Sequence, residues 1–229
     1  MAFPSVKLTT LASLAHRLPA TCWLAQRLEQ APERWATLPV WWVEGDLDMA
    51  ALDLVTTLSS DGQWLPPLPS TALDGSATHP GGALLWVDGH LRLQGALTGG
   101  WHTPASAAEP SSPAVHALVM GDAQVHCALL RQGQLHVQGN LSVHTLLWGD
   151  GAPGGLTVLG QSTAQVGLFT RGYAPQWNQP PSFDFTLQDA DPAGDSALWQ
   201  PADHETLGLV VPPRTWMPTM PEQAAWPRC

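Results

Sequence analysis

The sequence contains a short pattern of alternating apolar and polar residues that recurs around a glycine, five times between residues 41 and 164. The glycines at its centre are Gly45, Gly89, Gly121, Gly139 and Gly160. The last three of them lie 18 and 21 residues apart. This spacing is typical of one turn of a parallel β-coil, so the sequence predicts a repeat architecture.

Aligning the copies on their glycines produces columns of similar residues. Two positions before the glycine stand Val43, Val87, Val119, Val137 and Val158, and two positions after it stand Leu47, Leu91, Ala123, Leu141 and Ser162. Side chains two residues apart on a strand share a face, so both columns are expected to point inward. A third inward column is predicted eight residues after the glycine, at Leu97, Leu129, Leu147 and Leu168, and Asp53 interrupts it in the first copy.

These columns predict an all-β fold, a single-stranded parallel β-helix (solenoid), over residues 41–172. Turn-forming residues at about 59–83 and 99–113 indicate two insertions. Residues 1–40 are expected to form a short N-terminal α-helical cap, because residues 8–17 and the segment from Thr21 to Leu28 show helical spacing of apolar residues. Residues 173–229, which are rich in proline and tryptophan and acidic, are expected to form an irregular C-terminal arm packed on the solenoid.

Charge excludes some partners and favours others. The chain has 9 Lys and Arg against 19 Asp and Glu, a formal net charge of −10. Nucleic acid binding needs clustered cations, so it is disfavoured, and a basic protein partner is favoured. No apolar run reaches eighteen residues, so no membrane span is expected. The three cysteines form an odd number at no motif spacing, which favours a reducing compartment, and we expect a cytoplasmic protein.

One copy carries the clearest resemblance to a known family. Val137, Gly139, Leu141 and Val143, followed by a Leu-Leu pair at 146–147, resemble the repeat of bactofilins and other bacterial short-rung parallel β-helix proteins. The resemblance implies a β-helix that self-associates end to end, although the insertions and long terminal segments depart from that family. A looser resemblance is to uncharacterised bacterial β-helix proteins that accompany polymorphic toxins, which implies an immunity protein.

A column five residues after the glycine contains two histidines. It consists of Ala50, Gln94, His126, His144 and Gln165. His126 and His144 are therefore expected to stack about 4.8 Å apart on consecutive strands. A histidine pair of this kind can bind a metal ion or take up a proton near neutral pH. Because no third ligand is visible, we predict a polar ladder, with no metal, no cofactor and no catalytic residues.

Partner-binding residues are predicted in the acidic C-terminal segment, where carboxylates lie beside tryptophans that are suitable as anchors. The predicted set is Trp177, Asp184, Asp189, Asp191, Asp195, Trp199, Asp203 and Glu205. The sequence thus favours a non-enzymatic protein-binding module, in its most specific form a bacterial immunity protein that covers the active site of a basic toxin. The alternative is a bactofilin-like scaffold that oligomerises through coil edges, and the third hypothesis is a metal- or carbohydrate-dependent β-helix enzyme.

Overall fold

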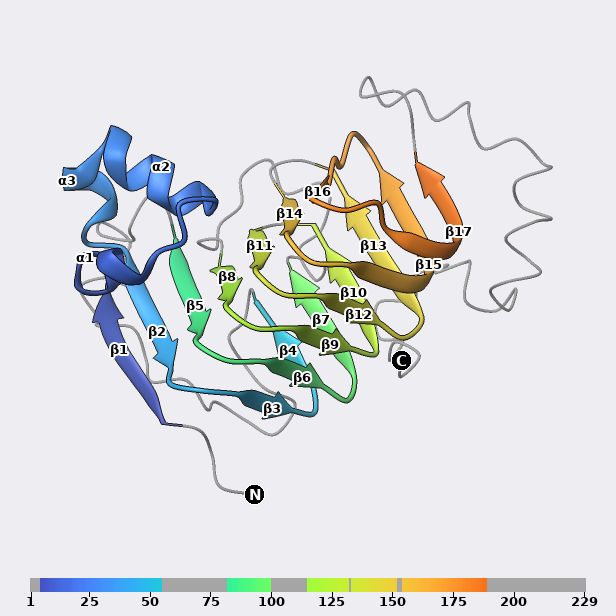
Figure 1. Cartoon of the computed structure of the whole chain (residues 1–229), viewed down its shortest axis with the longest axis horizontal. Helices are drawn as coiled ribbons and strands as arrows, with labels where there is room; N and C mark the ends of the chain where they lie inside the picture. Colours follow the sequence, from blue (N-terminus) through green and yellow to red (C-terminus); the bar gives the residue numbers. More distant parts are fainter. Residues whose placement is uncertain (1–4, 55–81, 100–114, 132, 152–153, 189–229) are drawn as a thin grey trace, which may run out of the picture.

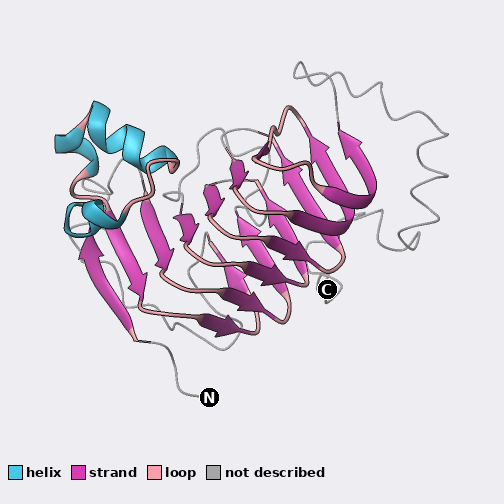
Figure 2. Cartoon of the chain, in the orientation of Figure 1, coloured by secondary structure: helices cyan, strands magenta, loops and turns pink. Residues whose placement is uncertain are grey.

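The computed structural model describes residues 5–54, 82–99, 115–131, 133–151 and 154–188. Within these ranges the chain is β-rich and winds through successive turns whose strands lie side by side (Figures 1 and 2). The strands belong to a seven-stranded sheet and a ten-stranded sheet, here called sheet A and sheet B. A complete turn contributes one strand to sheet A and two strands to sheet B.

Sheet A has the order β1 (Val6–Thr10), β2 (Pro39–Val43), β5 (Ala83–Val87), β8 (Val115–Val119), β11 (Gln134–Val137), β14 (Gly155–Val158) and β16 (Gln176–Trp177). Sheet B has the order β3 (Leu47–Met49), β6 (Leu91–Leu93), β9 (Ala123–Val125), β12 (Leu141–Val143), β15 (Ser162–Thr170), β13 (Leu146–Asp150), β10 (Cys127–Leu130), β7 (Ala96–Gly99) and β4 (Leu52–Asp53), and β17 (Ser182–Gln188) pairs with β15.

The prediction of an all-β, single-stranded parallel β-helix is wrong. Sheet A is mixed, because β1 runs antiparallel to β2, and a helical layer accompanies the sheets. Sheet B curls into a nearly closed, barrel-like parallel sheet, because β15 pairs with both β12 and β13. The physical reason lies in β15 itself, whose nine residues continue as one strand where the earlier turns bend at a corner.

The inward columns next to the glycines are confirmed. Val43, Val137 and Leu141 are fully buried, and the other members of both columns are no more than 1% exposed. The third column is only partly correct. Ala128, not Leu129, pairs with Leu147 and takes the inward position. The corner before it is one residue shorter than the corner before β13, so the inward position moves from eight to seven residues after the glycine.

The same one-residue shift explains the exception in the first copy. Leu52, which is 2% exposed, pairs with Leu97, while Asp53 pairs with Thr98. The first copy is therefore regular once the length of its corner is taken into account.

The repeated glycine is required by close packing between turns. An added Cβ at Gly139 would lie 2.7 Å from the carbonyl oxygen of Gly121 and would also overlap the Asp122 carboxylate. At Gly160 the same atom would lie 2.6 Å from the carbonyl oxygen of Gly139. From the second copy onward, each turn thus approaches the backbone of the previous one at its glycine, at a distance that only glycine permits.

The helices of the N-terminal segment are α1 (Leu11–Leu14), the 3-10 helix η1 (Ala15–Arg17), α2 (Trp23–Gln30) and α3 (Pro32–Trp35). They lie over the outer side of sheet A, where Leu24 and Trp35 belong to one buried cluster with Trp86 and Leu118 (Figure 1). The helix predicted over residues 8–17 begins only at Leu11, because residues 6–10 form strand β1 and extend the sheet edge.

The repeat does not end at residue 172 as predicted. Strands β16 and β17 pair in parallel with β14 and β15 and extend both sheets by one further strand. The alignment missed them because this turn has no central glycine. The predicted insertion at about 59–83 lies outside the described residues except for its last two, and the insertion at about 99–113 lies outside them except for Gly99.

In the parts of the chain that the structure describes, no helix has the length and apolar character needed to cross a membrane.

Candidate functional site: a polar groove on sheet B

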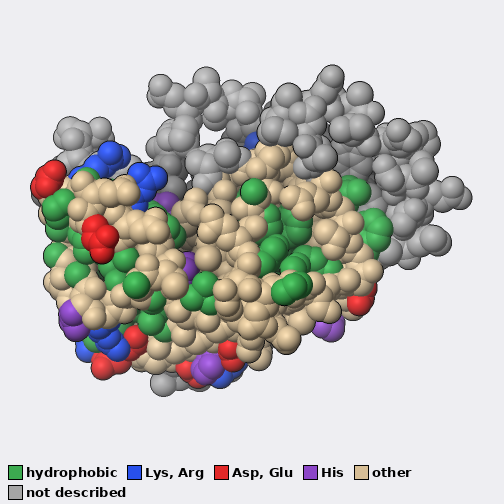
Figure 3. Space-filling model, turned by 45° about the horizontal axis from the view of Figure 1, so that its top comes forward, with side chains coloured by type: hydrophobic (Ala, Val, Ile, Leu, Met, Phe, Trp, Pro, Cys, Tyr) green, Lys and Arg blue, Asp and Glu red, His purple; other side chains and the backbone are tan. Residues whose placement is uncertain are grey.

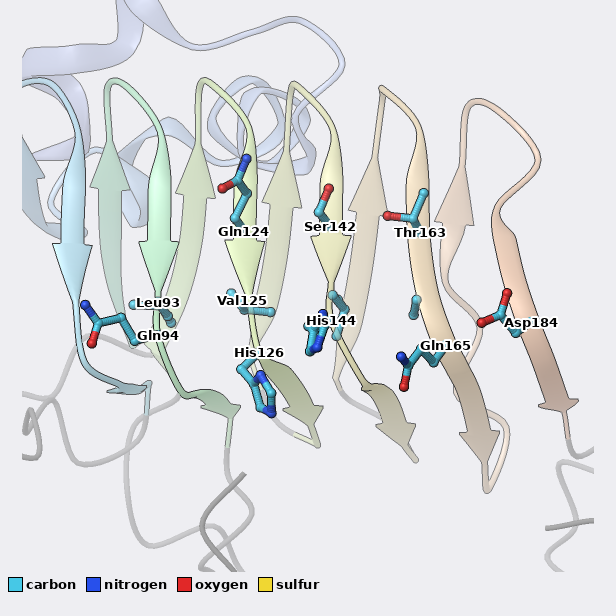
Figure 4. Close-up of a pocket in the computed structure, with 12 residues that line it drawn as sticks. Leu93, Gln94, Gln124, Val125, His126, Ser142, His144, Thr163, Gln165 and Asp184 are labelled. Carbon is cyan, nitrogen blue, oxygen red and sulfur yellow. The ribbon is translucent and has the colours of Figure 1, made fainter. Parts of the chain in front are cut away.

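A shallow groove of about 440 Å³ crosses the outer face of sheet B, over strands β6, β9, β12, β15 and β17 (Figure 4). Its lining residues are Leu93, Gln94, Gln124, Val125, His126, Ser142, Val143, His144, Thr163, Ala164, Gln165 and Asp184. The groove therefore runs across the strands, along the direction in which the turns stack.

Alternation along the strands produces the groove. In β9 and β12 the residues Val125 and Val143 point into the core, whereas Gln124 and Ser142 between the inward positions point outward. Register pairing places the outward residues of neighbouring strands next to one another, as for Ser142 with Gln124 and with Thr163. The result is a row of hydrogen-bonding side chains in the groove, Gln124 on β9, Ser142 on β12 and Thr163 on β15.

Two polar columns build this surface, and only one of them was predicted. The column five residues after the glycine supplies Gln94, His126, His144 and Gln165. The column three residues after it supplies Gln124, Ser142 and Thr163, which were not predicted as site residues. The signal was present as a polar position between two buried ones in each copy.

His126 and His144 come together as predicted. Their ring centroids are 5.1 Å apart and the rings are tilted by 34°. Among the described residues the two rings contact only each other, and both side chains line the groove (Figure 4).

Other histidines of the strands use a ring nitrogen within the fold. Nδ1 of His90 accepts a hydrogen bond from the backbone N–H of Asp122, and Nδ1 of His116 accepts one from Gln134. His136 is 1% exposed and contacts the amide of Gln138 through Nε2. Burial lowers the pKa of His136 to about 4, so this imidazole is neutral at physiological pH.

Of the predicted partner-binding residues, only Asp184 lines the groove. It is exposed on β17 and makes no ion pair with the described residues. Trp177 does not line the groove and instead packs, partly buried, against Phe169 and Phe183 at the end of the core, with ring centroids 6.1 and 5.9 Å away. Asp189, Asp191, Asp195, Trp199, Asp203 and Glu205 lie outside the described residues.

A second polar row follows the glycine corner and holds the turns together. Side-chain oxygens of Asp122 and Asn140 each accept the backbone N–H of the residue one turn further on, at 2.8 Å. In the first turn Asp46 accepts the N–H of His90 and pairs with Arg92. These contacts, the backbone hydrogen bond first, lower the pKa of the Asp46 carboxyl below its ordinary value. Because this row is used within the fold, it is structural.

Charges are distributed unevenly over the molecule. In the space-filling view, charged side chains gather toward the helical end and along one margin, whereas the middle of the visible face carries few (Figure 3). Apart from the two histidines, Asp184 is the one ionisable residue among the described residues that line the groove. Among the described residues there is no group of three or more His, Cys, Asp or Glu side chains placed to hold a metal ion.

Comparison of the chain with protein-family models, with curated proteins and with solved structures finds no match in any of the three.

Proposed function

We propose that the chain is a non-enzymatic protein-binding module whose polar groove receives an extended, basic segment of its partner. The observation that carries the proposal is Asp184, an exposed carboxylate without an ion pair among the described residues, at one end of a groove that has no lysine or arginine in its lining. A cationic side chain entering the groove meets the attractive charge of Asp184. Arg92 on β6, which lies next to Gln124, is already paired with Asp46.

The composition of the groove supports a polypeptide ligand. Gln94, Gln124 and Gln165 offer both donors and acceptors, which suits the N–H and C=O groups of an extended backbone. The excess of acids over the whole chain, 19 against 9 bases, adds a negative field that attracts a basic partner over a longer range. In its most specific form the partner is a basic toxin whose active site the module covers.

Site-specific crosslinking in the source cell tests the proposal. A photoreactive amino acid replaces Gln124 in the groove in one variant and Gln26, exposed on α2, in a matched control. We expect the groove variant alone to capture a protein of high isoelectric point, identified by mass spectrometry. The yield should fall in Asp184→Lys, while Glu29→Lys on the helical layer leaves it unchanged.

The same captured partner at both positions, or no partner at Gln124, would contradict the proposal. Added salt sharpens the test. An electrostatically assisted complex weakens as the Debye length shrinks from about 10 Å at 0.1 M to about 3 Å at 1 M.

Self-association through the end of sheet B is a second candidate function. Strand β17 pairs with β15 along one edge, and among the described residues no strand pairs with its other edge. Phe183, Phe185 and Leu187 are half-buried on that strand, an apolar edge of the kind that can template a further strand. Light scattering at micromolar concentration separates the two candidates, because a monodisperse monomer excludes assembly through β17.

A further inference from the structure

We propose that His126 and His144 form a two-imidazole binding site for a divalent transition metal, with Cu²⁺ as the tightest ligand. The inference goes beyond the proposed function, since it concerns an ion and the protein alone. It starts from the contrast among the histidines of the strands. His90, His116 and His136 each use a ring nitrogen in a contact with the fold, whereas His126 and His144 contact only each other among the described residues.

The separation of the two rings fits one shared ion. At a metal–nitrogen distance of about 2.0 Å each ring centre lies roughly 3.2 Å from the metal. Ring centres 5.1 Å apart then subtend an angle of about 105° at the ion, close to a tetrahedral or cis arrangement. Two imidazoles in linear coordination would have centres roughly 6.4 Å apart, which does not match the observed separation of 5.1 Å.

The local fold holds this separation. His126 directly follows β9 and His144 directly follows β12. These two strands pair in parallel, with Ala123 opposite Leu141 and Val125 opposite Val143, so the backbones of the two histidines are held one strand spacing apart. Rotation about the Cβ–Cγ bonds, which is a soft torsion in histidine, turns the tilted rings so that one nitrogen of each faces a common point. The open groove leaves room for this rotation (Figure 4).

The donor set selects the class of metal. Neutral imidazole suits Cu, Ni and Zn, whereas Mg²⁺ and Ca²⁺ require oxygen ligands, and Cu²⁺ binds most tightly among the divalent first-row ions. Asp184 lies on β17, two strands away from β12, at about 9.6 Å by strand spacing. It is therefore too far to complete the same coordination shell, and the remaining positions are open to water or to a ligand in the groove.

The test is a titration of the purified full-length chain with Cu²⁺ by calorimetry, together with electron paramagnetic resonance of the bound ion. His126→Gln and His144→Gln are the matched variants, because glutamine already occupies the same column at Gln94 and Gln165 and preserves the polar surface. His16→Gln, an exposed histidine on η1, is the control. Circular dichroism shows that each variant is folded.

We expect the parent chain to bind one more Cu²⁺ than a variant that carries both His126→Gln and His144→Gln. The bound ion should show nitrogen hyperfine structure from two imidazoles. Removing a partner in the outer shell of a metal site already costs 10–100-fold in affinity, so loss of either ligand should cost at least about tenfold. His16→Gln should leave the Cu²⁺ affinity unchanged, and Mg²⁺ should not bind at this site. Affinity retained in both variants, or lost in only one of them, overturns a shared site.

Discussion

Strands β5 and β6 follow one another in the same turn, yet they meet opposite environments. All five residues of β5 are buried, because its inner side faces the core and its outer side lies under the helices. In β6 only alternate residues are buried, and Arg92 between them is exposed. A strand covered on both faces loses the alternation that marks a half-buried one. Sheet A near its start is therefore an interior layer, whereas the outer face of sheet B at β6 is not covered by any helix of the described residues.

The difference extends to the polar groups on the two outer faces. Under the helices, the indole N–H groups of Trp42 and Trp86 have no hydrogen-bond partner within the part of the chain that the structure describes. On sheet B the outward polar groups are open to solvent in the groove. Substitutions that alter side-chain volume or charge should consequently lower the free energy of unfolding strongly on the outer face of sheet A and hardly change it on the outer face of sheet B.

The largest effect is expected at Trp86, which is fully buried between sheet A and the helical layer. Trp86→Ala should lower the free energy of unfolding by about 3–5 kcal/mol, because it leaves a cavity in a packed layer. Gln124→Ala on the open face should change it by less than about 0.5 kcal/mol. Urea denaturation measures both. Trp86→Phe, which removes the unpartnered N–H and keeps much of the volume, should cost less than Trp86→Ala. Equal costs for Trp86→Ala and Gln124→Ala would eliminate the distinction between the faces.

A pH effect is expected from His136, a polar residue buried on the covered face. Its pKa is about 4 in the folded chain against an ordinary value of 6.5. As the pH falls from 6.5 to 4 the unfolded chain takes up a proton that the folded chain refuses, so stability decreases in that window and levels off below it. The lowered pKa corresponds to at most about 3 kcal/mol. His136→Gln, which is neutral throughout, should remove this part of the slope in urea midpoints measured from pH 7.5 to 4.5. An unchanged slope would show that His136 is solvated.

The glycine corner, which joins the strand of sheet A to the first strand of sheet B in each turn, should tolerate no added side-chain atom. Gly139→Ala brings a Cβ within 2.7 Å of the Gly121 carbonyl oxygen, a backbone atom that cannot rotate away. We expect a loss of about 1–3 kcal/mol from this overpacking. Thermal denaturation of Gly139→Ala and of Gly139→Ala with Asp122→Ala measures it. Because the obstruction is mainly backbone, the second substitution should not restore stability, and full restoration would assign the clash to the carboxylate instead.

The smallest effect is expected in the polar row beside that corner. Asp122→Ala removes the acceptor for the backbone N–H of Asn140 and should cost about 1 kcal/mol. Asp122→Asn keeps a side-chain oxygen, as Asn140 does one turn later, and should cost less. Hydrogen exchange at the amide of residue 140 reports the bond directly. Equal protection in Asp122→Ala and the parent chain would mean that this contact does not form in solution.

Several features of the fold were predictable from local pattern. The valines two positions before each glycine, among them Val87 and Val158, are buried as expected. The stacking of His126 and His144 was also predictable, because residues at equal distance from the glycine in neighbouring copies meet on adjacent strands. Each of these predictions needs only the alternation along one strand and the parallel register between copies.

Other features depended on contacts that no pattern contains. The inward position of Ala128 in place of Leu129 depends on a corner that is one residue shorter, which apolar spacing alone did not reveal. Leu8 was placed in a helix because leucines recur at helical intervals, but pairing of β1 with β2 puts it in a strand and leaves it 36% exposed. Trp177 was predicted as a partner anchor from its acidic surroundings in the sequence, and only the structure shows that it packs, partly buried, against the core beside Phe169.

The sequence by itself determined that copies pair in parallel around a glycine corner, because alternation and close approach are properties of neighbouring residues. Only the tertiary structure decided how the strands close, since β15 pairs with both β12 and β13 through contacts between distant turns. It also decided which outer face the helices cover. That choice depends on which apolar surfaces bury one another most completely, a quantity that belongs to the packed molecule and not to any one segment.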